Sequence, residues 1–191
     1  IYGCLVGSEM CIRDRISGGG VFYSDAMEQL SQFAIKHNIP VTQTVMGYST
    51  MKRDHSHFAG QIGGLGGKNT NTLAKETDLA IAVGTKLADF TTGSWANFEN
   101  ENFKLVSINV SRYDANKHLA QAVVGDAKVS LTELSQALGD WKAGEDWNKK
   151  SQTELKLWNE HIDKESAPTN QEVPSYVQAI GAIYRLSLIH I

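Results

Sequence analysis

The run Asp78-Leu79-Ala80-Ile81-Ala82-Val83-Gly84-Thr85 is the clearest strand signal in the chain. Its apolar residues are continuous rather than alternating, which is typical of a parallel strand covered by helices on both faces. A second such run spans residues 104–110. We expect the two runs to lie side by side and to point in the same direction, because strands that alternate with helical segments indicate βαβ units.

The neighbouring segments fit the same alternation. Ser24 and Asp25 are candidate caps for a helix that carries Glu28 in its first turn and ends near His37. Residues 40–45 are short and β-branched, as in a strand, and a glycine-rich polar loop is expected over 46–68. Further helices are expected from about residue 69 to 77, over 127–138 and over 145–163. The sequence therefore predicts an α/β fold with a doubly wound, Rossmann-like parallel sheet.

Composition excludes two classes of partner. The net charge is −3, from 18 basic and 21 acidic residues that are interspersed, so no basic stripe favours a nucleic acid. No apolar run approaches the ~20 residues of a membrane-spanning helix. Both cysteines, Cys4 and Cys11, lie near the start of the chain, and their absence elsewhere fits a reducing, cytoplasmic location.

The two ends differ from the rest. Residues 1–15 match neither a strand nor a helix pattern, and both this segment and residues 186–191 resemble translated sequencing adaptor, so we expect them to be non-native. Residues 16–142 are expected to form the central α/β domain, and 143–173 a helix and a linker. Residues 174–185 are expected to begin a further, truncated domain.

Candidate ligand-binding residues lie where the strands are expected to end. Ligands of an open parallel sheet bind beyond the carboxyl ends of its strands. The residues expected there, as the mouth of a nucleotide-like cleft or of its remnant, are Gly19, Gly20, Gly84, Thr85, Lys86 and Asn109. For any single glycine a tight turn is the favoured interpretation, and an anion at the start of the first helix is the functional alternative. No catalytic residue and no metal site is predicted in this chain.

Several common chemistries are disfavoured. The triplet at residues 18–20 lacks the spacing of the dinucleotide fingerprint, and the strand at 40–45 does not end in an acidic residue, which argues against NAD. His55 and His57 match no metal-ligand spacing and are interpreted as solvated loop residues. No serine stands in a G-x-S-x-G turn, and the tryptophans are expected in the core or at an interface.

An ordered set of motifs resembles a known family. Residues 18–21, 39–41, 78–89 and 124–127 follow one another as in the central domain of thiamine-diphosphate enzymes such as acetolactate synthase. Residues 89–95, 108–110, 114–118 and 137–141 are similar to the trihydroxycyclohexanedione hydrolases of myo-inositol catabolism. Residues 173–185 resemble the start of the cofactor-binding C-terminal domain of those hydrolases.

The resemblance implies a whole enzyme that uses thiamine diphosphate and Mg²⁺. In the family, a glutamate of the N-terminal domain activates the cofactor and a Gly-Asp-Gly motif of the C-terminal domain holds the metal and the diphosphate. Gly125-Asp126-Ala127 is not that motif, since it falls at a strand-to-helix turn of the central domain. Asn109 stands where many relatives carry an acidic residue for an adenine dinucleotide, which argues against FAD.

The implied reaction is cleavage of a C–C bond. The cofactor carbanion would attack a carbonyl of the cyclic 1,2-dione, and hydrolysis would release 5-deoxy-glucuronic acid. This chain would then serve mainly as scaffold and subunit interface of a homodimer or homotetramer, and would be inactive by itself. Two alternatives remain open: the middle domain of an acetolactate-synthase-like carboligase, and a stand-alone nucleotide-binding domain.

Overall fold

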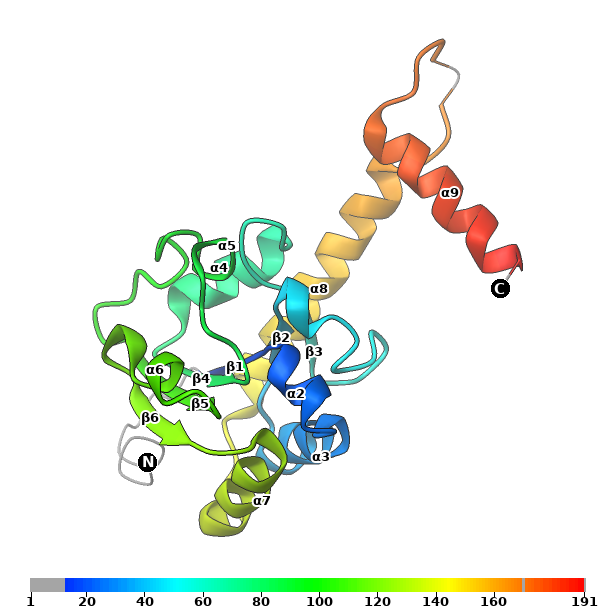
Figure 1. Cartoon of the computed structure of the whole chain (residues 1–191). Helices are drawn as coiled ribbons and strands as arrows, with labels where there is room; N and C mark the ends of the chain where they lie inside the picture. Colours follow the sequence, from blue (N-terminus) through cyan, green and yellow to red (C-terminus); the bar gives the residue numbers. More distant parts are fainter. Residues whose placement is uncertain (1–12, 170, 191) are drawn as a thin grey trace.

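The structure is a computed structural model that describes the backbone of residues 13–169 and 171–190 and the side chains of residues 14–169 and 171–186. Its centre is an all-parallel sheet with the strand order β3-β2-β1-β4-β5-β6 (Figure 1). The strands are β1 (Arg13–Ser17), β2 (Val41–Gln43), β3 (Phe58–Gln61), β4 (Leu79–Val83), β5 (Lys104–Asn109) and β6 (Gln121–Val124). The predicted doubly wound α/β fold is confirmed, including the parallel pairing of the two apolar runs.

Helices cover both faces of the sheet. The α-helices are α2 (Gly19–Tyr23), α3 (Met27–His37), α4 (Lys68–Glu76), α5 (Asp89–Thr92), α6 (Arg112–Ala115), α7 (Ala127–Leu138), α8 (Glu145–Glu165) and α9 (Tyr176–His190). Two 3₁₀ turns, η1 (Val45–Gly47) and η2 (Lys117–Leu119), follow β2 and α6.

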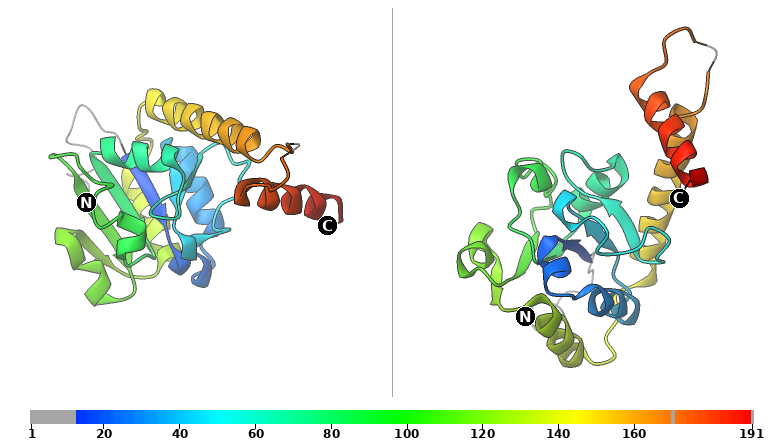
Figure 2. Two further views of the ribbon diagram at one scale, coloured as in Figure 1. Left: turned by 90° about the horizontal axis from the view of Figure 1, so that it is seen from above. Right: turned by 45° about the vertical axis from the view of Figure 1, so that its right-hand side comes forward.

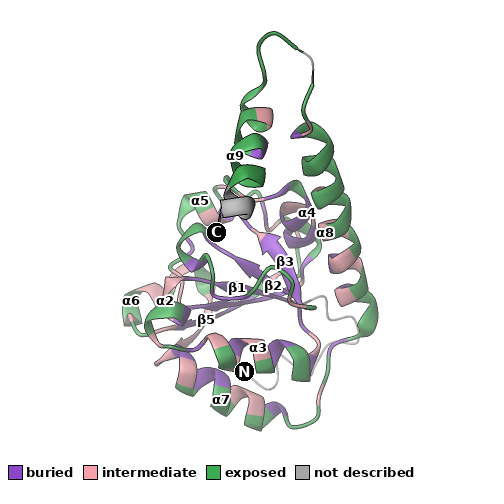
Figure 3. Ribbon diagram, turned by 90° about the vertical axis from the view of Figure 1, so that its right-hand side faces the viewer, coloured by how far each residue is buried: buried purple, intermediate pink, exposed green. Residues whose placement is uncertain are grey.

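The sheet separates two apolar layers. On one face, Leu30 and Phe33 of α3 and Leu131 of α7 pack against residues of β4 and β5 such as Ile81 and Ile108. On the other face, Ile16 of β1 and Ala80 and Ala82 of β4 meet Ala74 of α4, Ile62 after β3 and Leu87 after β4. Figure 3 shows the buried strands lying between these layers. Burial on both faces explains why β4 is apolar throughout.

Helix α8 packs against β3 and α4 through its N-terminal half, as far as Leu155. The Trp147 indole Nε1 donates a hydrogen bond to Asp14 Oδ1 in β1 at 3.0 Å, and Gln152 Nε2 donates to the Phe58 carbonyl at 2.9 Å. The rest of α8 projects from the body, and α9 folds back beside it (Figures 1 and 2). Arg185 of α9 donates to the Ser166 carbonyl, whereas Ile180 and Ile183 are 66% and 67% exposed. The described part of the chain holds no helix long and apolar enough to cross a membrane.

The first strand differs from the expectation. The central strand β1 begins at Arg13, inside the segment that the sequence analysis set aside, and it pairs with both β2 and β4. Asp14 and Arg15 are buried in it. Charged residues in a central strand produce no apolar run, so the pattern could not reveal it. The expectations for residues 1–12 and 191 lie outside the described residues, and α9 extends beyond residue 185 to His190.

Two local predictions were wrong. Residues 19–23 form the short helix α2, so Ser24 ends a helix rather than starting one, and Asp25 has a positive φ of 51°. Helix α3 is preceded by Ala26 instead. Strand β3 lies within the predicted loop, because an edge strand that contains Gly60 and Gln61 lacks the usual β-branched residues.

Candidate functional site

A cleft opens where the strand order of the sheet reverses, between β1 and β4. Ser17 of β1 pairs with Val83 of β4, and Val83 pairs with Ile108 of β5, so the three strands end at one level. A cavity of about 340 Å³ lies beyond these ends. It is lined by all of the candidate residues, namely Gly19, Gly20, Gly84, Thr85, Lys86 and Asn109. These residues lie far apart in the sequence, and the parallel sheet gathers them, as expected at a topological switch point.

The glycines allow the loop after β1 to touch the loop after β4. Gly18 N donates to the Val83 carbonyl and Gly20 N to the Gly84 carbonyl, both at 2.9 Å. A Cβ atom on Gly20 would lie 2.6 Å from Gly84 Cα, and Gly84 has a φ of +61°. These two amides are therefore engaged with the neighbouring loop rather than open to an anion. Helix α2 is also only five residues long, so its dipole is small.

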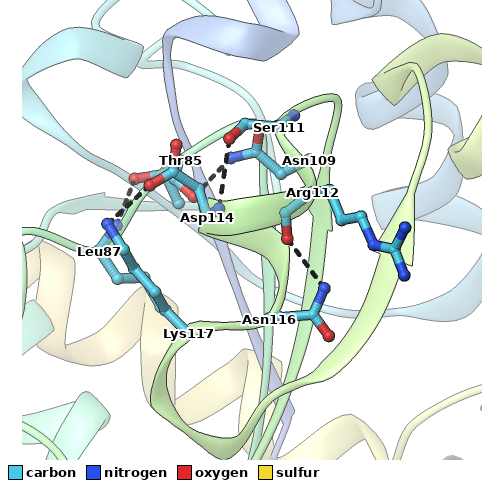
Figure 4. A network of polar contacts seen from close by, with 8 residues as sticks. All are labelled: Thr85, Leu87, Asn109, Ser111, Arg112, Asp114, Asn116 and Lys117. Carbon is cyan, nitrogen blue, oxygen red and sulfur yellow. Dashed lines mark hydrogen bonds and ion pairs between the residues drawn. The ribbon is translucent and has the colours of Figure 1, made fainter.

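Asn109 holds the loops around the cleft together (Figure 4). Its Nδ2 donates to the Thr85 carbonyl at 3.1 Å, and its Oδ1 accepts from Ser111 N at 2.9 Å. Both ends of the amide therefore bind backbone. An ionised acidic residue in this position could not donate to Thr85, which gives the asparagine a structural role of its own.

The charges at the cleft are mixed. Lys86 is exposed at its mouth, and Asp114 lies on its wall, bonded through Oδ1 to Lys117 Nζ at 2.7 Å. The hydrogen bond from Lys117 lowers the pKa of Asp114, so this carboxyl stays ionised at neutral pH. Among the described residues of the wall, a ligand would meet the exposed Lys86 cation and a paired carboxylate. A polyphosphate would bind less favourably in this mixed environment than in a cleft lined by basic residues alone.

Aromatic and apolar residues that the sequence analysis missed complete the wall. They come from the end of α2, from η1 and from α5, and are Tyr23, Val45, Met46 and Phe90. No local pattern marks them, since each is brought to the cleft by a connection that follows a strand. Phe90 and the wall residue Asp114 lay within motifs quoted for the family resemblance, but neither was selected as a site residue. Such a wall fits a ligand that contains a flat ring. The ring would lie on the glycine backbone, between the exposed side chains.

The histidine pair is structural rather than solvated, so that interpretation was wrong for His57. The His57 side chain is 8% exposed, its Nε2 donates to Asn38 Oδ1 at 3.1 Å, and its Nδ1 accepts from Ser56 Oγ at 2.9 Å. Burial lowers the pKa of His57 to about 4. His55 Nε2 bonds Ser31 Oγ at 2.9 Å. The two rings therefore fasten the loop before β3 to α3.

The described residues do not fit thiamine diphosphate with Mg²⁺. No three His, Cys, Asp or Glu residues of the described ranges gather as a metal site. The amides of Gly18 and Gly20 at the cleft are occupied by backbone, and the carboxylate of Asp114 is paired with Lys117. A diphosphate–metal pair needs free oxygen ligands and free donors, which this cleft does not offer.

Comparison with known proteins agrees with the fold. Residues 16–134 match the family model described as the thiamine pyrophosphate enzyme, central domain. The chain is 44% identical over 123 residues to the 3D-(3,5/4)-trihydroxycyclohexane-1,2-dione hydrolase of Clostridium perfringens strain 13. It is 45% identical over the same length to hydrolase 2 of that name from Bacillus cereus, and 44% identical to the Bacillus anthracis protein.

These matches cover unequal shares of the proteins compared. They include 64% of this chain but only 19% of each of the three relatives, so the chain spans about a fifth of their length. The matched family model covers more than half of the chain, and the sheet that it spans is the one described above. The chain thus belongs to the thiamine pyrophosphate enzymes, and residues 16–134 are a central domain of that family.

Proposed function

We propose that this chain is the central part of a thiamine-diphosphate-dependent hydrolase that opens a cyclic 1,2-dione by cleaving a C–C bond. The observation that carries the proposal is the 44% identity over 123 residues to trihydroxycyclohexane-1,2-dione hydrolases. The intact enzyme would convert trihydroxycyclohexane-1,2-dione to 5-deoxy-glucuronic acid in the cytoplasm, with Mg²⁺ as the metal. Its cofactor would be bound by residues outside those described here.

Within that enzyme the central domain would act mainly as scaffold and subunit interface. Helix α9 supports this role, because Ile180, Ile183 and Tyr184 are exposed on it. Its side-chain hydrogen bonds to the segment that follows α8 reach Ser166 and Thr169. Apolar side chains on a projecting helix need a covering surface. We propose that residues 174–185 open a further domain of a longer polypeptide, which assembles as a homodimer or homotetramer.

The decisive experiment uses the longer polypeptide that is expressed from the gene encoding residues 16–185. With thiamine diphosphate and Mg²⁺, it should consume the cyclic dione and release the open-chain acid. Formation of acetolactate from pyruvate, with no reaction of the dione, would replace the proposal with a carboligase. The 191-residue chain by itself should show no heat of binding when titrated with thiamine diphosphate and Mg²⁺, and micromolar binding would contradict the scaffold role.

A second candidate is nucleotide binding at the sheet-edge cleft, the cavity lined by Gly20, Thr85, Lys86 and Asn109. It is favoured by the cavity of about 340 Å³ at the switch point and by its apolar wall. A thermal-shift experiment with FAD, ADP and NAD tests it, since a ligand that binds only the folded state raises the melting temperature. Stabilisation that is lost in Lys86→Ala and Tyr23→Ala would support a nucleotide site, and no shift with any of the three would reject it.

A further inference from the structure

The two outermost strands of the sheet differ in what covers them. Strand β3 lies under α8, where Leu155 faces Gly60 and Gln152 Nε2 donates to the Phe58 carbonyl at 2.9 Å. Strand β6 is outermost on the opposite side, away from α8 (Figure 1). No other described segment forms a hydrogen bond with its outer side. One side of the sheet is therefore closed by a helix of the chain, and the other side ends in an unpaired strand.

The backbone of β6 directs two residues away from the sheet. Gly125 N donates to the Asn109 carbonyl at 3.1 Å, so this amide points toward β5. Because the backbone groups of successive residues alternate in direction along a strand, Ala122 and Val124 point their N–H and C=O groups outward. Unpaired backbone groups on an edge strand are a template for pairing with a strand of another chain.

Strand β6 has few of the features by which edge strands avoid such pairing. Its sequence, Gln121-Ala122-Val123-Val124, holds no charged residue and no proline. Its register with β5 is uninterrupted, so no bulge bends the strand away. Val124 is 52% exposed. Its one protective feature is a length of four residues, which limits the area that pairing can bury.

The turn that leads into β6 exposes an apolar side chain on a strained backbone. His118 and Leu119 have φ angles of +61° and +56°, a region that bulky residues rarely adopt. The side chain of Leu119 is fully exposed. Strain of this kind is concentrated at surfaces that bind a ligand or a partner. The start of β6 therefore has the same character as its outer side.

Two copies of β6 fit each other as an antiparallel pair about a two-fold axis. If Val123 lies opposite Val123 of the copy, Ala122 of each chain lies opposite Val124 of the other. Each of these two residue pairs can exchange both N–H···O bonds, so all of the outward groups are paired. Such a contact is isologous, because each copy uses the same groups.

The two ends of β6 also complement each other in this arrangement. Lys117 and His118 precede the strand, and Asp126 follows it. Lys117 is bonded to Asp114, whereas the imidazole of His118 is exposed, and antiparallel pairing brings it to the end of the copy that carries Asp126. The same pairing brings Leu119 to the start of α7 in the copy. The match favours a second copy over an unrelated strand.

We propose that β6 is a contact surface between two copies of this chain, which join their sheets through an antiparallel β6 pair. This pairing rests on the assembly proposed above, for which it names the surface, and not on the reaction with cyclic diones. Four residues and their flanks bury less than the roughly 1,600 Å² of a standard interface. We therefore expect a weak dimer, with a dissociation constant on the order of 10–100 µM.

Sedimentation velocity of the 191-residue chain tests the pairing, at concentrations from about ten-fold below to about ten-fold above that constant. The monomer should convert to a dimer across this range. A monomer at every concentration would overturn the proposal and leave the reaction of the longer polypeptide untouched. Conversely, a longer polypeptide that does not open the cyclic dione would refute the proposed function without changing this dimer.

Variants at Val124 locate the contact. The amide of Val124 points outward, so Val124→Pro removes a donor without breaking the bonds to β5. Because each copy loses one bond, dimerisation should weaken about ten-fold or more. Val124→Lys, which adds a charge to the edge strand, decides the matter if the proline variant does not fold.

The control is Val45→Lys, the same substitution at a valine that is 48% exposed and lines the sheet-edge cleft. It should leave the dissociation constant unchanged. Equal weakening by the two lysine variants, or no weakening by Val124→Lys, would refute the β6 surface.

Amide hydrogen exchange distinguishes a second copy from other segments that could cover β6. The amides of Ala122 and Val124 should exchange more slowly as the protein concentration rises through the dissociation constant. The amide of Gly125, which is bonded within the sheet, should not respond. Slow exchange of Ala122 and Val124 at every concentration would show that another part of the same chain covers the strand, and would overturn the proposal.

Discussion

The guanidinium carbon of Arg15 lies 3.4 Å from the centroid of the Phe33 ring, inside the main core of the domain. Arg15 is 0% exposed, and its Nε, Nη1 and Nη2 have no hydrogen-bond partner among the described residues. Burial lowers the pKa of this guanidinium. A cation–π contact offsets only part of the cost of desolvating a charge, so this residue destabilises the strand on which the sheet is centred.

Replacing Arg15 with leucine should therefore stabilise the protein. We expect Arg15→Leu to raise the free energy of unfolding by about 2 kcal/mol, because a buried charge without a partner is exchanged for an apolar chain. Urea denaturation followed by circular dichroism measures it. The control is Arg53→Leu, an exposed residue, which should change little. A loss of stability in Arg15→Leu would mean that the guanidinium has partners in solution.

Asp14 should make stability depend on pH. Burial raises its pKa to about 6 from 3.8, although hydrogen bonds from Thr77 and Trp147 oppose the rise. Because the folded pKa exceeds the unfolded one, the stabilising effect of the neutral carboxyl is complete below about pH 4. It is lost as the pH rises through about 6, at a cost of about 3 kcal/mol.

Asp14→Asn isolates this effect. An asparagine keeps the acceptor for Trp147 and offers Thr77 an amide donor, without a charge. Unfolding free energies of both proteins should be measured from pH 4 to pH 8, and the advantage of the variant should grow across the interval between the two pKa values. A constant difference across that range would show that Asp14 does not titrate there.

His57 should destabilise the protein in acid. Its pKa is lowered to about 4 from 6.5, chiefly by burial, with further lowering from His55 and Arg15. A base with a lowered pKa contributes stability above the unfolded pKa, and loses it as the pH falls from about 6.5 toward 4. His57→Gln should remove about 2 kcal/mol of that loss, measured by urea denaturation at pH 7 and pH 4.5. His161→Gln, at an exposed position on α8, should leave the acid loss unchanged.

Gly84, in the sheet-edge cleft, and Gly144, which precedes α8, give a matched pair of substitutions. Gly84→Ala should cost at least about 2 kcal/mol, because it adds a Cβ at a positive φ and within 2.6 Å of Gly20 Cα. Gly144→Ala meets nothing within 4 Å and should stay within about 0.5 kcal/mol of the parent protein. Thermal unfolding of both variants checks this. Equal melting temperatures would show that the two loops can move apart freely.

The sequence predicted the parts of the fold that have strong local signals. The continuous apolar residues of β4 and β5 predicted the parallel sheet and the positions at which its strands end. Those positions in turn indicated the candidate residues of the cleft. Strand β1 was missed because Arg13, Asp14 and Arg15 contradict the apolar pattern. Strand β3 was missed because it is a short edge strand.

The wall of the sheet-edge cleft and the course of α8 could not be predicted in the same way. Tyr23, Met46 and Phe90 reach the cleft through connections whose course depends on packing rather than on local sequence. Leu155 of α8 faces Gly60 of β3, and the crossing of α8 over this edge strand is fixed by long-range contacts such as that of Gln152 with Phe58. A periodic pattern identifies a helix but not the angle at which it crosses its neighbours.

The hydrogen bond between Trp147 and Asp14 joins residues that are 133 positions apart. It fixes the N-terminal end of α8 to the start of β1. Helix α8 has 21 residues, a length of about 30 Å, and Trp147 lies in its first turn. The polypeptide that follows α8 is thereby held at a fixed distance from the start of β1. A segment joined to the C-terminal end of α8 would therefore have its distance from the sheet set by the length of this helix and by the contacts of its N-terminal half with β1 and β3.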